Sequence, residues 1–308
     1  MLGLRHIHLR DLQSARNHAL PGLSGATEGN TRVKSLAVSV TSVPATRVVE
    51  AEAEVLYTAT IRSPIAPMHC EPGIASQMVS QQLAGHRVDV IDEEGDWARA
   101  RGSDAYEGWI HSGFLVRTPR GQEPADDGAR LMSLGCMTRT AANDNRVLPF
   151  RAILSPDETV ISGESITLAQ RGARFPLEPD AITRTAQQFF VCTSYLWGGI
   201  TPWGADCSGL VQSVFALHGL QLPRDAWQQA ERGSDAGGDV GELRPADLLF
   251  FSDRSDGRIT HVGISLGNRR MVHLALGRGG YAIERLDDRR DAYVDRLRGR
   301  FVLARRVV

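Results

Sequence analysis

Residues 205–219 read ADCSGLVQSVFALHG, and this stretch decides the fold of the C-terminal part of the chain. From Cys207 to His218, apolar residues recur at the i, i+3, i+4 and i+7 spacing of a helix, and Gly219 follows as a stop signal. The spacing therefore predicts a helix that begins at Cys207. The free amides and the dipole of a helix N-terminus favour an anion, so we expect this end to stabilise the thiolate of Cys207.

Three strands are predicted after this helix, at residues 247–251, 261–266 and 271–276. His261 and His273 lie in the second and third strands. If Leu266 pairs with Arg270, the two imidazoles lie diagonally on one face, which demands a three-residue loop or a bulge in the hairpin. A nucleophilic thiol needs a base in hydrogen-bond reach and a group that orients the base, and these two histidines are the candidates.

The remaining elements divide the chain into four parts. A helix over residues 181–191, with Asp180 as its N-cap, opens a C-terminal α+β domain at residues 173–308. Short alternating strands separated by turns indicate a small β-barrel over residues 53–119. A polar linker at residues 120–128 is expected to join it to a second short β-rich unit at residues 129–172. Residues 1–52 contain no Phe, Trp or Tyr, which predicts a disordered tail.

Composition excludes several classes of protein. With 35 basic and 36 acidic residues, the formal charge of −1 excludes a nucleic-acid binder that depends chiefly on phosphate contacts. Four cysteines among 308 residues are too few for a disulfide scaffold, and no apolar run is long enough for a membrane span. The first residues lack the apolar core of a secretory signal, so we expect a cytoplasmic protein. One cysteine and two histidines could also bind zinc, but close ligand pairs such as C-x-x-C are absent, so no metal or cofactor is expected.

Six ordered motifs surround the candidate residues, at 195–199 (YLWGG), 206–210 (DCSGL), 222–225 (LPRD), 244–248 (RPADL), 260–264 (THVGI) and 271–273 (MVH). Together they resemble the NlpC-type cell-wall peptidases over roughly residues 175–300. These are papain-like cysteine hydrolases that cut γ-D-glutamyl-diamino-acid bonds in peptidoglycan peptides. The resemblance implies that Cys207 is the nucleophile, His261 the general base and His273 the residue that orients it.

Four upstream motifs, at 66–68 (APM), 78–81 (MVSQ), 95–97 (GDW) and 106–109 (YEGW), are similar to the bacterial SH3-like domain of the dipeptidyl-peptidase branch of this family. That branch recognises a free N-terminal L-Ala before γ-D-Glu, and the resemblance implies that Asp206 and Tyr106 hold the amine. It places Tyr195, Ser208, Asp225 and Gln77 among the other substrate-binding positions. Gln77 stands where relatives often carry an acidic residue, and Ala226 where they carry a small hydroxyl residue.

Physical reasoning gives Asp206 two alternative roles. A carboxylate next to a cysteine raises the pKa of the thiol, and a buried carboxylate without a cation is costly, so a ligand ammonium would account for it. Alternatively, Asp206 is the N-cap of the helix.

The sequence therefore predicts an α+β protein with a papain-like catalytic domain preceded by two small SH3-like β-barrels. We expect a monomeric cysteine endopeptidase that hydrolyses the γ-D-glutamyl-diamino-acid bond of free murein peptides bearing N-terminal L-Ala, with no nucleic-acid or membrane partner. The alternatives are a papain-like amidase or acyltransferase acting on another substrate, and a non-catalytic cell-wall-binding protein. The sequence leaves open which diamino acid is preferred.

Overall fold

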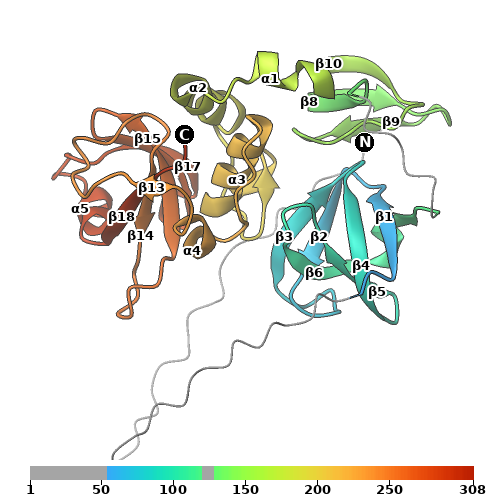
Figure 1. The fold of residues 1–308 in the computed structure, drawn as a ribbon, viewed down its shortest axis with the longest axis horizontal. Helices are drawn as coiled ribbons and strands as arrows, with labels where there is room; N and C mark the ends of the chain where they lie inside the picture. Colours follow the sequence, from blue (N-terminus) through green and yellow to red (C-terminus); the bar gives the residue numbers. More distant parts are fainter. Residues whose placement is uncertain (1–53, 120–127) are drawn as a thin grey trace, which may run out of the picture. The chain divides into compact units, whose positions relative to one another are not determined.

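The computed structural model describes residues 54–119 and 128–308, and Figure 1 shows their helices and strands. The predicted tail at residues 1–52 and all but the last residue of the predicted linker at 120–128 lie outside the described residues. Within the described ranges, no helix is long and apolar enough to cross a membrane.

The first β-rich unit is a seven-stranded antiparallel sheet with the order β3-β2-β6-β5-β4-β1-β7. Its strands are β1 (Tyr57–Ile61), β2 (Ile65–His69), β3 (Met78–Leu83), β4 (Arg87–Glu94), β5 (Trp97–Arg101), β6 (Glu107–His111) and β7 (Leu115–Arg117). Small and aliphatic side chains such as Ala59, Met68 and Val90 form its buried core. The prediction of short strands separated by turns over residues 53–119 is confirmed.

The second β-rich unit is a three-stranded antiparallel sheet with the order β10-β8-β9. Its strands are β8 (Leu131–Arg139), β9 (Asn145–Leu148) and β10 (Thr159–Thr167). Phe150, just after β9, contacts Phe189 and Phe190 with ring centroids 4.6 and 5.9 Å apart, which fixes this unit on the C-terminal domain. Its assignment as an SH3-like barrel stays a prediction.

The C-terminal domain has a six-stranded antiparallel sheet with the order β13-β18-β14-β15-β16-β17. Its strands are β13 (Ser234–Asp235), β14 (Leu248–Phe251), β15 (His261–Gly267), β16 (Arg270–Ala275), β17 (Gly280–Arg285) and β18 (Phe301–Arg306), and a short hairpin is formed by β11 (Ile200–Thr201) and β12 (Gly204–Ala205). Its helices are α1 (Arg171–Arg174), α2 (Pro179–Phe189), α3 (Cys207–Leu217), α4 (Ala226–Gln229) and α5 (Ala292–Arg298).

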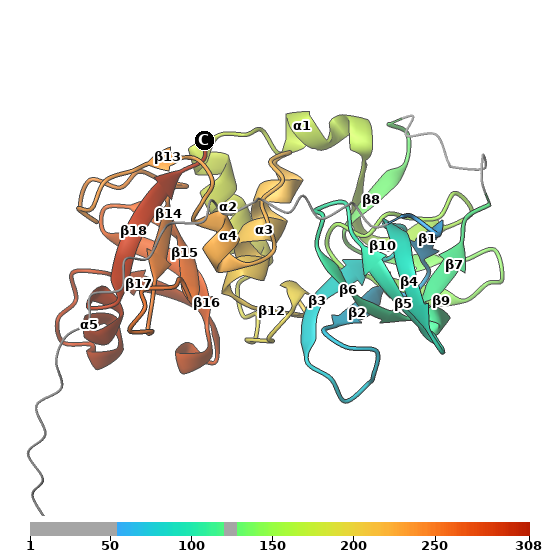
Figure 2. The same ribbon diagram turned by 60° about the horizontal axis from the view of Figure 1, so that its bottom comes forward.

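Helix α3 is the centre of this domain. All of its residues are buried, and Leu210 and Val214 belong to the same apolar core as Ile264 and Val272 of the sheet. Figure 2 shows α2 and α3 side by side next to the sheet, as Figure 1 does from another direction. The helix begins at Cys207 and is followed by Gly219 at φ 89°, as the sequence predicts.

Helix α2 begins earlier than expected. The sequence predicts a helix over residues 181–191 capped by Asp180, whereas Pro179 occupies its first position and Glu178 the N-cap. Proline is favoured at the first helical position because its fixed φ suits a helix and its missing N–H costs no hydrogen bond there. The predicted N-cap is therefore wrong by two residues.

The β15–β16 hairpin has the register and the bulge that the histidine pair requires. Ile264 pairs with Val272, while Gly267 pairs with Arg270, so the register shifts between the two pairs. The turn residues Asn268 and Arg269 both have positive φ, 50° and 58°, as a two-residue type I′ turn demands. The bulge thus compensates for the short turn and returns both histidines to one face.

Candidate active site

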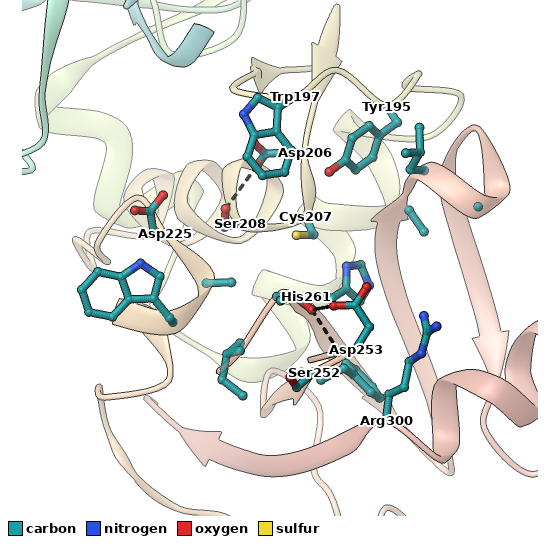
Figure 3. Close-up of a pocket in the computed structure, with 18 of the residues that line it drawn as sticks. Tyr195, Trp197, Asp206, Cys207, Ser208, Asp225, Ser252, Asp253, His261 and Arg300 are labelled. Carbon is teal, nitrogen blue, oxygen red and sulfur yellow. Dashed lines mark hydrogen bonds between the residues drawn. The ribbon is translucent and has the colours of Figure 1, made fainter. Parts of the chain in front are cut away.

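A cavity of about 910 Å³ opens at the N-terminal end of α3. The predicted site residues that line it are Tyr106, Tyr195, Asp206, Cys207, Ser208, Asp225 and His261. Figure 3 shows Cys207 at the end of its helix with its sulfur toward the cavity, and His261 on the neighbouring strand. His273 lies behind His261 and contacts it, whereas Gln77 is exposed and is not part of the cavity lining.

The start of α3 is fixed by Asp206. Its carboxylate accepts hydrogen bonds from the backbone N–H groups of Gly209, at 2.7 Å, and Gly198, at 2.8 Å. This is an N-cap, and it sets Cys207 as the first helical residue. Gly209 is required here because a Cβ atom at this position would lie 2.0 Å from the carbonyl oxygen of Gly199.

The surroundings of Cys207 favour the neutral thiol over the thiolate. Burial and the neighbouring Asp206 raise the pKa of the thiol to about 12, although the backbone N–H groups of Val262 and Ser208 oppose this shift. The expectation that the helix N-terminus holds a thiolate is therefore wrong, because burial outweighs the helix dipole. A base has to remove the proton as the sulfur attacks.

A histidine pair stands next to the cysteine. Nε2 of His261 lies 2.8 Å from Nδ1 of His273, which is fully buried. Nε2 of His273 lies 3.4 Å from a carboxylate oxygen of Glu284 on β17, and Arg278 binds both oxygens of that carboxylate, at 2.7 and 3.0 Å. The sequence predicted the histidine pair but not Glu284 or Arg278.

This chain of contacts fixes the histidine tautomers. Although burial opposes it, hydrogen bonds from His273 and Arg278 hold the pKa of Glu284 below its ordinary value. A carboxylate only accepts, so Nε2 of His273 carries a hydrogen, and its Nδ1 accepts from Nε2–H of His261. The lone pair of His261 is then on Nδ1. Burial and the neighbouring His273 lower the pKa of His261 to about 3, which keeps this imidazole neutral.

The charge of Asp206 is compensated within the protein. Arg224 binds it through two nitrogens, at 2.7 and 3.1 Å, and the Arg224 side chain is only 1% exposed. The hydroxyl of Ser208 donates a further hydrogen bond to Asp206, at 3.2 Å. Arg224 therefore already supplies a cation for Asp206, so a ligand ammonium is not needed to compensate its charge. The role of Asp206 in holding the substrate amine stays a prediction. The structure confirms the alternative role of Asp206 as the N-cap of α3.

Asp225 also lines the cavity, and it forms no salt bridge with any described residue. The hydroxyl of Tyr106 donates to it across 3.4 Å, from the loop before β6. Burial raises the pKa of Asp225, and burial and Asp225 together raise the pKa of Tyr106 to about 12. This end of the cavity therefore presents a phenol and a partly desolvated carboxylate, groups that suit an ammonium.

Gln77 does not join this group. It contributes a backbone carbonyl that accepts from the N–H of Cys70, at 3.0 Å. Gln81 is the nearby glutamine that contacts the catalytic domain, since its side-chain oxygen accepts from the N–H of Ile200 at 3.1 Å. In the part of the chain that the structure describes, no group of three His, Cys, Asp or Glu side chains could hold a metal ion.

A cysteine at the start of a buried helix and a histidine pair on the adjacent antiparallel sheet are the arrangement of a papain-like cysteine peptidase. The chain contains an NlpC/P60 domain, because that family matches residues 192–294, and the bacterial SH3 domain family matches residues 67–116. It is a cysteine-type hydrolase of the peptidoglycan-related endopeptidases. The non-catalytic alternative is therefore wrong.

Its curated relatives carry related names. The gamma-D-glutamyl-L-lysine dipeptidyl-peptidase of Bacillus subtilis is 29% identical over 214 residues, which are 63% of this chain and 71% of that protein. Dipeptidyl-peptidase 6 of Lysinibacillus sphaericus is 27% identical over 256 residues, 74% of this chain and 92% of that protein. The crystal structure of an NlpC/P60 family protein from Bacillus cereus, 20% identical, matches 81% of this chain and 99% of its own with a TM-score of 0.64 and shows the same fold.

Proposed function

We propose that this protein hydrolyses the γ-D-glutamyl-diamino-acid bond of free murein peptides that begin with L-Ala. The observation that carries the proposal is the pairing of Asp225 with Tyr106 in the cavity that also holds Cys207 and His261. The names of the curated relatives support the same bond and the same release of a dipeptide. A peptide bound by its amine at Asp225 is cut at a fixed distance from its N-terminus.

The reaction starts from the neutral thiol and imidazole. Nδ1 of His261 takes the proton of Cys207 as the sulfur attacks the γ-glutamyl carbonyl carbon. The backbone N–H of Cys207, which has no intrahelical partner, and the hydroxyl of Tyr195 are the donors for the oxyanion. His261 then gives the proton to the leaving amine, the C–N bond breaks, and a thioester remains on Cys207. Water, deprotonated by His261, hydrolyses the thioester and regenerates the thiol.

Glu284 acts through the histidines. It accepts from Nε2–H of His273, which keeps Nδ1 of His273 free to accept from His261 and keeps the basic lone pair of His261 toward the cysteine. When His261 is protonated during attack, the carboxylate also stabilises the positive charge on the pair. Glu284 is thus a positioning residue, and it does not line the cavity.

Replacing Glu284 by glutamine is expected to lower kcat roughly tenfold or more and to leave KM unchanged, because the histidine tautomer is no longer enforced. A carboxylate next to the histidine pair favours its protonated form, so its removal moves the acid limb of kcat/KM to lower pH. Glu284→Asp should recover part of kcat, and the exposed Glu242→Gln is the matched control. An unshifted acid limb would show that Glu284 only supports the fold.

Amine recognition is tested with the free tripeptide L-Ala-γ-D-Glu-diamino acid and its N-acetylated analogue. We expect kcat/KM for the free peptide to be higher by at least about tenfold, since acetylation removes the charge that Asp225 binds. Asp225→Asn should lower kcat/KM on the free peptide roughly 10–100-fold, the range for loss of a hydrogen bond to a charged group. Asp256→Asn, at an exposed site outside the cavity, is the control. Equal rates on both peptides in the unmodified protein would refute the proposal.

A further inference from the structure

Two arginines line the cavity on the side away from Asp225. Arg296 lies in α5 and Arg300 two residues beyond its end, four positions apart. Figure 3 shows the guanidinium of Arg300 directed toward the cavity, across Cys207 and His261 from Asp225. Neither arginine forms a salt bridge with a residue in the described ranges.

Other arginines near the cavity are already engaged. Arg224 binds Asp206, and Arg278 binds Glu284. Arg258 lies over the ring of Trp227, 5.3 Å from its centroid, on the α4 side of the cavity. Arg296 and Arg300 are therefore the guanidinium groups left to bind a ligand in this half of the site.

One carboxylate accompanies the two arginines. Asp253 lines the cavity, accepts a hydrogen bond from the hydroxyl of Thr260 at 2.9 Å and forms no salt bridge within the described part of the chain. This half of the cavity thus combines two free guanidinium groups with one free carboxylate. Such a set is complementary to a zwitterion, and guanidinium groups are suited to binding carboxylates in a bidentate manner.

The orientation in which the substrate binds places the departing diamino acid in the half of the cavity that contains Arg296 and Arg300. The amine and the acyl part lie at Asp225 and Tyr106 under the proposed function, and the scissile carbonyl lies at Cys207. Because His261 protonates the leaving amine, the diamino acid that departs lies on the His261 side, toward Arg300 (Figure 3).

We propose that Arg296 and Arg300 bind a carboxylate at the end of the side chain of the departing diamino acid, and that the enzyme therefore prefers diaminopimelate to lysine in this position. The inference rests on the proposed function. A lysine side chain ends in an ammonium alone, which Asp253 can bind. A diaminopimelate side chain ends in an ammonium and a carboxylate, which engage Asp253 and the arginines together.

The test compares three peptides that share L-Ala-γ-D-Glu and end in diaminopimelate, in diaminopimelate with its side-chain carboxylate amidated, or in L-lysine. In the unmodified protein, kcat/KM should be about tenfold higher for diaminopimelate than for the other two, as expected for a hydrogen-bonded charge pair. Arg300→Met should lower the diaminopimelate rate to that of lysine and leave the lysine rate within about twofold. The side chain of Arg300 is exposed, and the substitution keeps the backbone carbonyl that accepts from the N–H of Ser252.

Arg298→Met, at the last residue of α5 and outside the cavity lining, is the matched control and should leave all three rates unchanged. Equal rates on diaminopimelate and its amide in the unmodified protein would overturn the inference and leave the proposed function intact. An equal loss on all three peptides in Arg300→Met would also overturn it, since the arginine would then bind the α-carboxylate that the peptides share. Failure to cut any of the three would refute the proposed function itself.

Discussion

Cys207→Ser is expected to lower kcat on the free tripeptide by at least about 10⁴-fold while the melting temperature stays nearly unchanged. The substitution exchanges one buried atom for another of similar size, so the packing at the start of α3 is kept. Its chemical effect is large because the site already disfavours an anion. Burial and Asp206 raise the pKa of the thiol to about 12, and a serine hydroxyl is a far weaker acid than a thiol.

Cys70→Ser is the control, since Cys70 is exposed and lies in the SH3 domain outside the cavity. It should retain full activity. Measurable turnover by Cys207→Ser above the uncatalysed rate would mean that another group attacks the carbonyl. Mass spectrometry of the unmodified protein after rapid mixing with substrate gives a second readout, because a thioester adds the mass of the dipeptide less one water to the fragment that contains Cys207.

The residues that sequence analysis placed correctly are those whose position is set locally. Cys207 follows from a helix start, and the His261–His273 contact follows from the register of one hairpin, including the bulge. Both depend on residues close in sequence, and periodicity and turn chemistry report on these directly.

The residues that it missed depend on contacts between distant segments. Arg224 was visible in the LPRD motif, but nothing in the sequence shows that it crosses to Asp206. Glu284 was missed because β17, the strand that carries it, was not predicted. The partner cation of Asp206 was missed for the same reason, since it comes from another loop.

Helix position alone also proved a poor guide to the state of the thiol. A helix N-terminus contributes a modest stabilisation to an anion, whereas complete burial can shift a pKa by several units. Cys207 lies at a helix N-terminus and is buried, and the adjacent charge of Asp206 raises the pKa of its thiol further. The histidine pair is therefore needed to activate the nucleophile and not merely to stay close to it.

Arg224→Met is expected to lower the free energy of unfolding by about 3–5 kcal/mol, the cost of leaving a buried charge without its partner. Arg224 also donates to Ser208, at 2.8 Å, and to Ser80 on β3, at 3.2 Å, so it joins the SH3 domain to the start of α3. Denaturant titration of the variant and of the exposed control Arg232→Met measures the difference.

The double variant Asp206→Asn/Arg224→Met separates the charge from the packing. If the loss in Arg224→Met comes from an uncompensated carboxylate, removing that charge as well should recover part of the stability, so the two effects are not additive. Asp206→Asn alone should also destabilise, because in either orientation an amide NH₂ group would face the guanidinium of Arg224 and the backbone N–H of Gly198 or Gly209. Strictly additive losses would show that the two residues stabilise the fold independently, and the compensation of Asp206 by Arg224 would then be refuted.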